Sequence, residues 1–344
     1  MEAARPPSDE DAPDQPEDAS PDADLILRYT LYMAQADKLA IEALNGNSQL
    51  RRPPGTRTPT RWSHSTELAK QSVQYYERAA ALRPDLGEPH FRAAEVINRH
   101  LLTAGSLDIG GMILRERKYA ERALAHWRAF AELDPLDPRV TDTLFDQALV
   151  YTRLATTDDF HEAIRCYETL LQRTSSSGGL RDFGTYYGNL AETYMMVGRL
   201  PDAIATYERA LEYGNGPVHG YGLAVALDRD GQTERAREVM LHYAMSDKLG
   251  ALVRDGVFFV PRGERDYYLG LGYDALGDHV RALDHYERFI RSNAHPQYQP
   301  RAVAHVKRLK AIVKTLPKVT PRRVKKAQTL ELGGSWTRVE VVKP

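Results

Sequence analysis

Cysteine is nearly absent from this sequence of 344 residues, because Cys166 is the only one. A single cysteine excludes an intramolecular disulfide and a multi-cysteine zinc site, so the folded chain must be stabilised by packing. The sequence also lacks a run of about 18 apolar residues, and its N-terminus lacks the basic start and apolar stretch of a signal peptide. We therefore expect a cytoplasmic protein, with the periplasm as the alternative if a signal or anchor was removed.

The net charge is small, at -1, because two strongly charged ends cancel each other. Residues 1–24 contain nine Asp or Glu and one Arg (-8), whereas residues 301–344 contain twelve Lys or Arg and two Glu (+10). The first segment is rich in proline and has almost nothing to bury, so we predict that it is a disordered tail. Arginine outnumbers lysine 35 to 11, a bias typical of GC-rich bacterial genomes.

From Leu25 onward, apolar and small residues recur with helical spacing, and the predicted helices come in pairs. In the clearest pair, one stripe precedes a turn at Gly198 and a second stripe follows it. A small residue in each helix lets the two backbones approach, while the tyrosines fill the space beside that contact. The two stripes consist of Tyr187, Leu190, Ala191 and Tyr194, and of Ala203, Tyr207 and Ala210.

This arrangement resembles the tetratricopeptide repeat (TPR), whose unit is a helical hairpin of about 34 residues. The resemblance implies an all-α, right-handed superhelical solenoid of about six hairpins. We expect a capping helix at 301–316, with Val303, Val306, Leu309, Ile312 and Val313 on its apolar face, and a small β-hairpin around Gly333 and Gly334. The six predicted hairpins are 25–84, 87–135, 139–174, 182–214, 217–247 and 265–293.

Three insertions interrupt the predicted array, at 47–65, 105–117 and 248–264, and the last contains a short run with strand propensity at 257–260. The sequence therefore divides into an acidic tail at 1–24, a solenoid with its capping helix at 25–316, and a basic linker with the β-hairpin tail at 317–344. We also predict that this tail packs on the solenoid near 257–260.

Two short motifs resemble metal sites but lack necessary ligands. Asp228, Asp230 and Gly231 resemble a calcium loop, yet alanine occupies the first ligand position and the tract falls on a repeat turn. His161 begins a sequence like that of a metalloprotease helix, but Arg165 stands where the second histidine is needed. We therefore expect no catalytic residues, no metal and no cofactor, and a chain that is not an enzyme.

The resemblance implies a scaffold or adaptor that binds a peptide or helix of a partner protein along the concave wall formed by the first helices. By analogy, the setting is a bacterial cell-envelope motility, pilus or secretion assembly. Binding of the acidic chaperone tail is disfavoured, because Gly188 and Glu192 stand where that clamp needs Lys and Asn. The residues predicted to face the partner are Glu192, Met195, Met196, Tyr221, Val225, Arg229, Tyr267, Leu271 and Asp274.

A basic tract, Pro321 to Lys326, carries the alternative function. Its charge suits nucleic acid, an anionic surface or an acidic protein segment, and the acidic residues 1–24 are one candidate for that contact. The tract lacks the interleaved aromatic residues of nucleic-acid modules. We therefore place a regulatory nucleic-acid or anionic-surface binder second, behind the protein scaffold.

Overall fold

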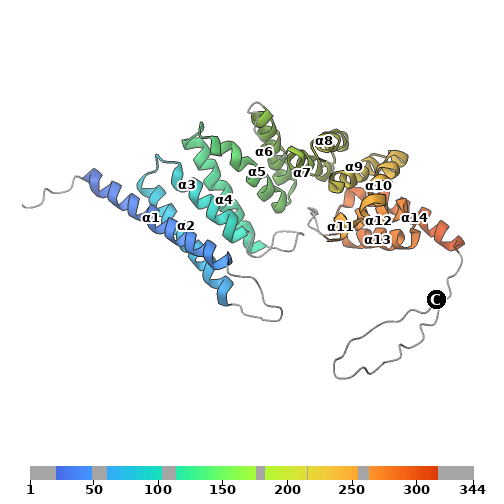
Figure 1. Cartoon of the computed structure of the whole chain (residues 1–344), viewed down its shortest axis with the longest axis horizontal. Coiled ribbons are helices and arrows are strands. Elements are labelled where there is room, and N and C mark those ends of the chain that lie inside the picture. Colours follow the sequence, from blue (N-terminus) through green and yellow to red (C-terminus); the bar gives the residue numbers. More distant parts are fainter. Residues whose placement is uncertain are drawn as a thin grey trace, which may run out of the picture.

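The computed structural model describes residues 21–48, 60–102, 114–175, 183–214, 216–254 and 263–316. Within these ranges every regular element is a helix. Figure 1 shows the helices in one elongated row, with α1 and α2 at one end and α12, α13 and α14 at the other. The all-α class predicted from the sequence is confirmed for these residues.

Six consecutive hairpins form the row, and a last helix covers its C-terminal end. In the second hairpin the first helix continues through a π-helical turn, Ile97–Leu102, before the connection to its partner. The paired helices are α1 (Pro21–Ser48) with α2 (Thr60–Leu82), α3 (Glu88–Val96) with α4 (Leu114–Leu133), α5 (Pro138–Leu154) with α6 (Thr157–Ser175), α7 (Phe183–Met196) with α8 (Leu200–Tyr213), α9 (Pro217–Arg229) with α10 (Thr233–Asp247), and α12 (Glu264–Ala275) with α13 (His279–Ser292).

Glycine sets the turns of the last three hairpins. Gly198, Gly231 and Gly277 have φ angles of +79°, +89° and +80°, a left-handed conformation that costs glycine little. In the third hairpin Ala155 takes the same conformation at φ 59°, where its methyl group makes it less favourable. The turn that the sequence pattern placed at Gly198 is therefore present and is repeated.

Small residues let helices pack closely, both within a hairpin and between neighbouring hairpins. A Cβ added to Gly222 in α9 would lie 2.3 Å from the ring of Tyr207 in α8, so only glycine fits there. The same relation holds between Gly270 and the ring of Tyr286, at 3.0 Å. Tyr207 and Tyr286 therefore fill the space that the missing side chains leave.

The interior consists of two groups of buried residues. One belongs to the first two hairpins and reaches Val150 and Leu154 of α5, while the other runs from the third hairpin to α14. The partly buried ring of Tyr151 packs against both groups. The third hairpin is therefore the link between the two halves of the row.

Helix α14 (Gln299–Thr315) covers the last hairpin, where the sequence predicted a cap. Its packed face consists of Ala302, His305 and Leu309, with Val306 partly buried beside them. Val303, predicted on the apolar face, is 50% exposed. Val303 therefore lies outside the packed face, which instead includes His305, the partner of an acidic residue on α9 described below.

Several elements extend into segments that were predicted to be irregular. Helix α1 already begins at Pro21, so residues 21–24 are helical rather than part of a disordered tail. The insertion at 47–65 includes helical residues at both ends, that at 105–117 contains the start of α4, and that at 248–264 contains the short helix α11 (Gly250–Arg254). The predicted strand at 257–260, the basic tract at 321–326 and the β-hairpin tail lie outside the described residues.

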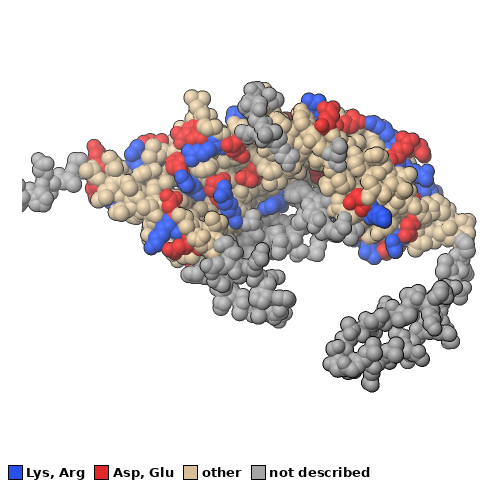
Figure 2. Space-filling model, viewed as in Figure 1, with Lys and Arg blue, Asp and Glu red and all other residues tan. Residues whose placement is uncertain are grey.

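The surface of the body carries both charges in alternation. Figure 2 shows acidic and basic side chains interspersed over the face in view, from the first hairpin to the last. Many of these form exposed pairs one helical turn apart, such as Arg209 with Glu212 and Arg288 with Asp284. In the described ranges, no helix is both long and apolar enough to cross a membrane.

Candidate functional site: a self-filled groove

The first helices of the last three hairpins, α7, α9 and α12, bring together the residues that were predicted to face a partner. The structure buries eight of these nine side chains. Met195, Tyr221, Val225 and Tyr267 have no exposed surface at all, and Asp274 alone keeps partial exposure. The other four buried side chains are Glu192, Met196, Arg229 and Leu271. The prediction that these eight residues line an open groove is therefore wrong.

A short 3-10 helix between α13 and α14, Pro296–Tyr298, lies against the end of α7 and covers part of this groove. The hydroxyl of Tyr298 donates a hydrogen bond of 2.6 Å to the backbone carbonyl of Met195. The side-chain amide of Gln297 donates one of 3.2 Å to the carbonyl of Met196. The last carbonyls of a helix lack partners within the helix, and this segment donates to two of them in α7. Met195 also accepts from the backbone N–H of Gly198 at 3.1 Å.

Arg229 lies at the centre of the filled groove. Its guanidinium carbon is 3.9 Å from the ring centroid of Tyr298 and 4.5 Å from that of Tyr267, so the cation is enclosed by two aromatic side chains. One of its terminal nitrogens lies 2.5 Å from Oε1 of Glu264, and neither side chain of this ion pair has exposed area. A guanidinium in this environment is held in place rather than presented to a partner.

Glu264 has a second neighbour, because its Oε2 lies 2.6 Å from Nδ1 of His295. Burial alone raises the pKa of Glu264, but the nearby Arg229 and His295 outweigh burial and lower the pKa below its ordinary value. The carboxylate is therefore charged, and it connects the first turn of α12 to the residue that precedes the Pro296–Tyr298 segment.

Glu192 in α7 is a buried carboxyl in the same groove. The hydroxyls of Tyr268 and Tyr207 both donate to its Oε2, the first at 2.8 Å, while Oε1 has no hydrogen-bond partner among the described residues. Burial, with a contribution from Glu264, raises the pKa of Glu192 to about 7. This carboxyl therefore gains or loses its proton near neutral pH.

Asp228 anchors the capping helix to the groove. Its Oδ2 accepts a hydrogen bond of 2.7 Å from the hydroxyl of Tyr267 and lies 2.8 Å from Nε2 of His305, while its Oδ1 pairs with Arg301 at 2.7 Å. Burial raises the pKa of Asp228, and His305 and Arg301 lower it by more, so it lies well below its usual range. This residue resembled a calcium ligand in sequence, whereas in the structure it is an ion-pair centre.

Sequence reasoning did not identify His295, Tyr298, Arg301 and His305 as partners of the groove. One indication of this site was present in the sequence, because Asp228 and Arg229 are two adjacent charged residues at the end of α9. Both are buried in the structure. Buried charges require partners of opposite sign. Arg301 and His305 of α14 supply them for Asp228, and Glu264 of α12 supplies one for Arg229.

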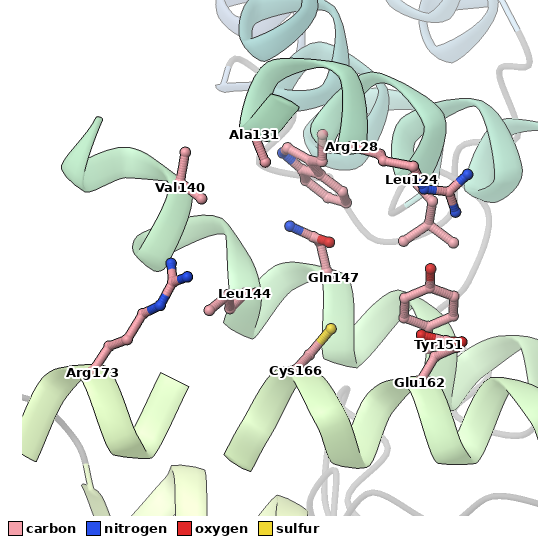
Figure 3. Close-up of a pocket in the computed structure, with 11 residues that line it drawn as sticks. Leu124, Arg128, Ala131, Val140, Leu144, Gln147, Tyr151, Glu162, Cys166 and Arg173 are labelled. Carbon is pink, nitrogen blue, oxygen red and sulfur yellow. The ribbon is translucent and has the colours of Figure 1, made fainter. Parts of the chain in front are cut away.

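A cavity of about 290 Å³ lies between α4, α5 and α6 (Figure 3). In the close-up, Gln147 and Cys166 point into it from α5 and α6. Burial raises the pKa of the Cys166 thiol to about 11, so the thiol is protonated and weakly nucleophilic at neutral pH. The lining residues are Leu124, Trp127, Arg128, Ala131, Val140, Leu144, Gln147, Tyr151, Glu162, Cys166 and Arg173.

In the part of the chain that the structure describes, no three His, Cys, Asp or Glu side chains are grouped so that they could hold a metal ion. The buried carboxylates of the groove are instead each paired with arginine, histidine or tyrosine. The arrangement serves packing and attachment of the C-terminal cap.

Comparison with solved structures gives several helical-repeat proteins of low sequence identity, and no curated protein matches the sequence. YrrB, described as a TPR protein with an unusual peptide-binding site, has 16% identity and a TM-score of 0.38 over 68% of this chain and 99% of that chain. PilF of Pseudomonas aeruginosa has 14% identity and a TM-score of 0.42 over 82% and 99%. The C-terminal part of a TPR repeat-containing protein from Cytophaga hutchinsonii has 11% identity and a TM-score of 0.41 over 82% and 99%.

Family models described as tetratricopeptide repeat match two segments of the chain, residues 187–217 and 266–295. These segments coincide with the fourth and the sixth hairpin, both of which have a glycine with positive φ at the turn. The chain is therefore a tetratricopeptide-repeat protein.

Proposed function

We propose that this protein is a noncatalytic scaffold that binds a peptide or helix of a partner protein on the wall formed by the first helices of its hairpins. The observation that supports this proposal is the row of six stacked hairpins, because stacking produces a continuous wall larger than a single helix needs. We further propose that the partner belongs to a bacterial cell-envelope assembly. Identification of the partner by the crosslinking experiment described below tests this part of the proposal.

The first helices of the last three hairpins are already covered by other parts of the chain, so the proposed binding surface lies elsewhere on the wall. In the last three hairpins eight of the nine predicted contact residues are buried, and Tyr298 and Gln297 contact the end of α7. We therefore place the partner on the first helices of the second and third hairpins, α3 and α5. The side chain of Arg99, on the π-helical turn that continues α3, is 67% exposed, and Asp142 on α5 is also exposed.

Charged groups of both signs gather on this part of the wall. Arg99 pairs with Glu95 at 2.7 Å. Burial raises the pKa of Asp146, while Asn98, Arg99 and Arg153 lower it by less. A partner segment with alternating acidic and basic residues would match this surface better than an apolar helix.

Site-specific photo-crosslinking in cells tests the proposal. A photoreactive residue at position 99 or 142 should capture the same protein, because both positions lie on the proposed wall. A matched control at Met245, which is 67% exposed on the second helix α10, should not capture it. Capture of an identical set of proteins from all three positions, or of none from 99 and 142, would contradict the proposal.

A further inference from the structure

Helix α1 is the free flank at one end of the row (Figure 1). Its inner face is packed, with Ala36, Leu39 and Ala43 buried against α2. Its outer face is unusually apolar for an exposed helix, because five large side chains on it are more than half exposed. These are Ile26 at 54%, Leu27 at 58%, Leu31 at 57%, Ile41 at 58% and Leu44 at 53%.

The outer residues of α1 follow a regular spacing. Steps of four, three, four, three and four residues connect the exposed positions, which is the repeat of a two-helix coiled-coil seam. The seam contains two polar side chains, Lys38 in its middle, next to the small Ala34, and Asn45 at its end. Its successive residues are Leu27, Leu31, Ala34, Lys38, Ile41 and Asn45.

We propose that the outer face of α1 pairs with α1 of a second copy of this chain, in antiparallel orientation about a two-fold axis near residue 36. In this register Leu31 packs against Ile41 of the second copy, and Lys38 crosses Ala34. The alanine gives room for the aliphatic stem of the lysine while its ammonium reaches solvent. Each such contact occurs twice, because a two-fold interface uses the same patch on both copies.

Charge complementarity favours a second copy as the occupant. The residues that flank the seam include Arg28, whose side chain is 53% exposed, and Glu42, which is also exposed. In the antiparallel register that aligns the apolar layers, Arg28 of each copy lies beside Glu42 of the other.

The two ends of the row differ in whether a further helix covers the terminal hairpin. At the C-terminal end α14 covers the last hairpin, with Leu309 fully buried. Terminal repeats of a solenoid need a polar outer face or a covering element, and α1 has an apolar outer face. Pairing of two α1 helices provides the covering element, and it joins two scaffolds end to end while both walls remain accessible.

Sedimentation velocity of the full chain over a range of concentrations tests the pairing. We expect a monomer–dimer equilibrium in which Leu31→Glu weakens association about 100-fold or more, because two leucines leave the seam in each dimer. The matched control is Val303→Glu on α14, a position that is 50% exposed and outside the seam. It should leave the equilibrium unchanged, and circular dichroism should show that both variants remain folded.

Charge reversal tests the register itself. Arg28→Glu and Glu42→Arg should each weaken the dimer about threefold to tenfold, and the double variant should restore it. A chain that stays monomeric at high concentration overturns the proposal, and so does a dimer that persists in the Leu31→Glu variant. Failure of the double variant to recover the affinity overturns the antiparallel register. Neither result affects crosslinking from positions 99 and 142, so this inference and the proposed function are tested separately.

Discussion

The hydroxyl of Tyr298 donates a hydrogen bond of 2.6 Å to the backbone carbonyl of Met195, 103 residues earlier in the chain. This contact closes the wall of the last three hairpins over Arg229, whose guanidinium carbon lies 3.9 Å from the centroid of the same tyrosine ring. A segment of the C-terminal cap thus occupies the place where a ligand was expected from the repeat pattern.

Two substitutions separate the contribution of the Tyr298 hydroxyl from that of its ring. Tyr298→Phe removes the hydroxyl, while the Met195 carbonyl still accepts from the backbone N–H of Gly198 at 3.1 Å, so we expect a loss of about 0.5–1.5 kcal/mol in the free energy of unfolding. Tyr298→Ala also removes the ring over Arg229 and should cost more. Urea denaturation followed by circular dichroism measures both losses, and equal losses would show that the ring contributes nothing beyond the hydroxyl.

The second prediction concerns the buried ion pair of Arg229 and Glu264. Arg229→Met leaves Glu264 as a buried charge with only His295 beside it, and we expect a loss of about 3–5 kcal/mol. The double variant Arg229→Met, Glu264→Gln should recover part of this loss because no unpaired charge remains. The control is Arg209→Met in the exposed pair with Glu212, where thermal denaturation should show a loss below about 1 kcal/mol. A double variant no more stable than the single one would contradict this account.

The hairpins could be predicted from the sequence because their determinants are local. A small residue such as Ala191, a tyrosine such as Tyr207 and a turn glycine such as Gly198 recur at fixed spacing, and each acts within one hairpin or between neighbours. The start of α1 at Pro21 was missed because a proline-rich acidic composition indicates disorder, whereas proline and acidic residues also suit the first turn of a helix.

The groove could not be predicted because it depends on how far the row curves. Tyr298 reaches Met195 and His305 reaches Asp228 only when hairpins far apart in sequence come close, and the spacing within one repeat does not contain that curvature. The exposed position of Val303 was also missed, because the packed face of α14 includes His305, whose partner Asp228 lies 77 residues earlier in the chain.

Gly222 offers a test of the close approach between hairpins. Gly222→Ala would place a Cβ 2.3 Å from the Tyr207 ring, so we expect a loss of about 1–3 kcal/mol through displacement of that ring. Gly270→Ala, at 3.0 Å from Tyr286, should cost less. Gly214→Ala is the control, because its added Cβ has no neighbour within 4 Å, and thermal denaturation should rank the three variants in this order.

Glu192 gives the protein a pH dependence of known sign. In the unfolded chain this glutamate releases its proton near pH 4.5, whereas the folded protein holds it to about pH 7. Between these values the folded state binds more protons, so the free energy of unfolding falls as pH rises, by up to about 3 kcal/mol.

Comparison of wild type with Glu192→Gln isolates this contribution, because the amide keeps the shape of the side chain and cannot titrate. We expect the stability of the variant, measured by urea denaturation from pH 5 to pH 8, to fall less steeply than that of wild type. Glu212→Gln, at a side chain that is 58% exposed, should leave the slope unchanged. Parallel curves for wild type and Glu192→Gln would mean that Glu192 is charged in the folded protein throughout this range, with the hydroxyls of Tyr207 and Tyr268 sufficient to stabilise the carboxylate despite its burial.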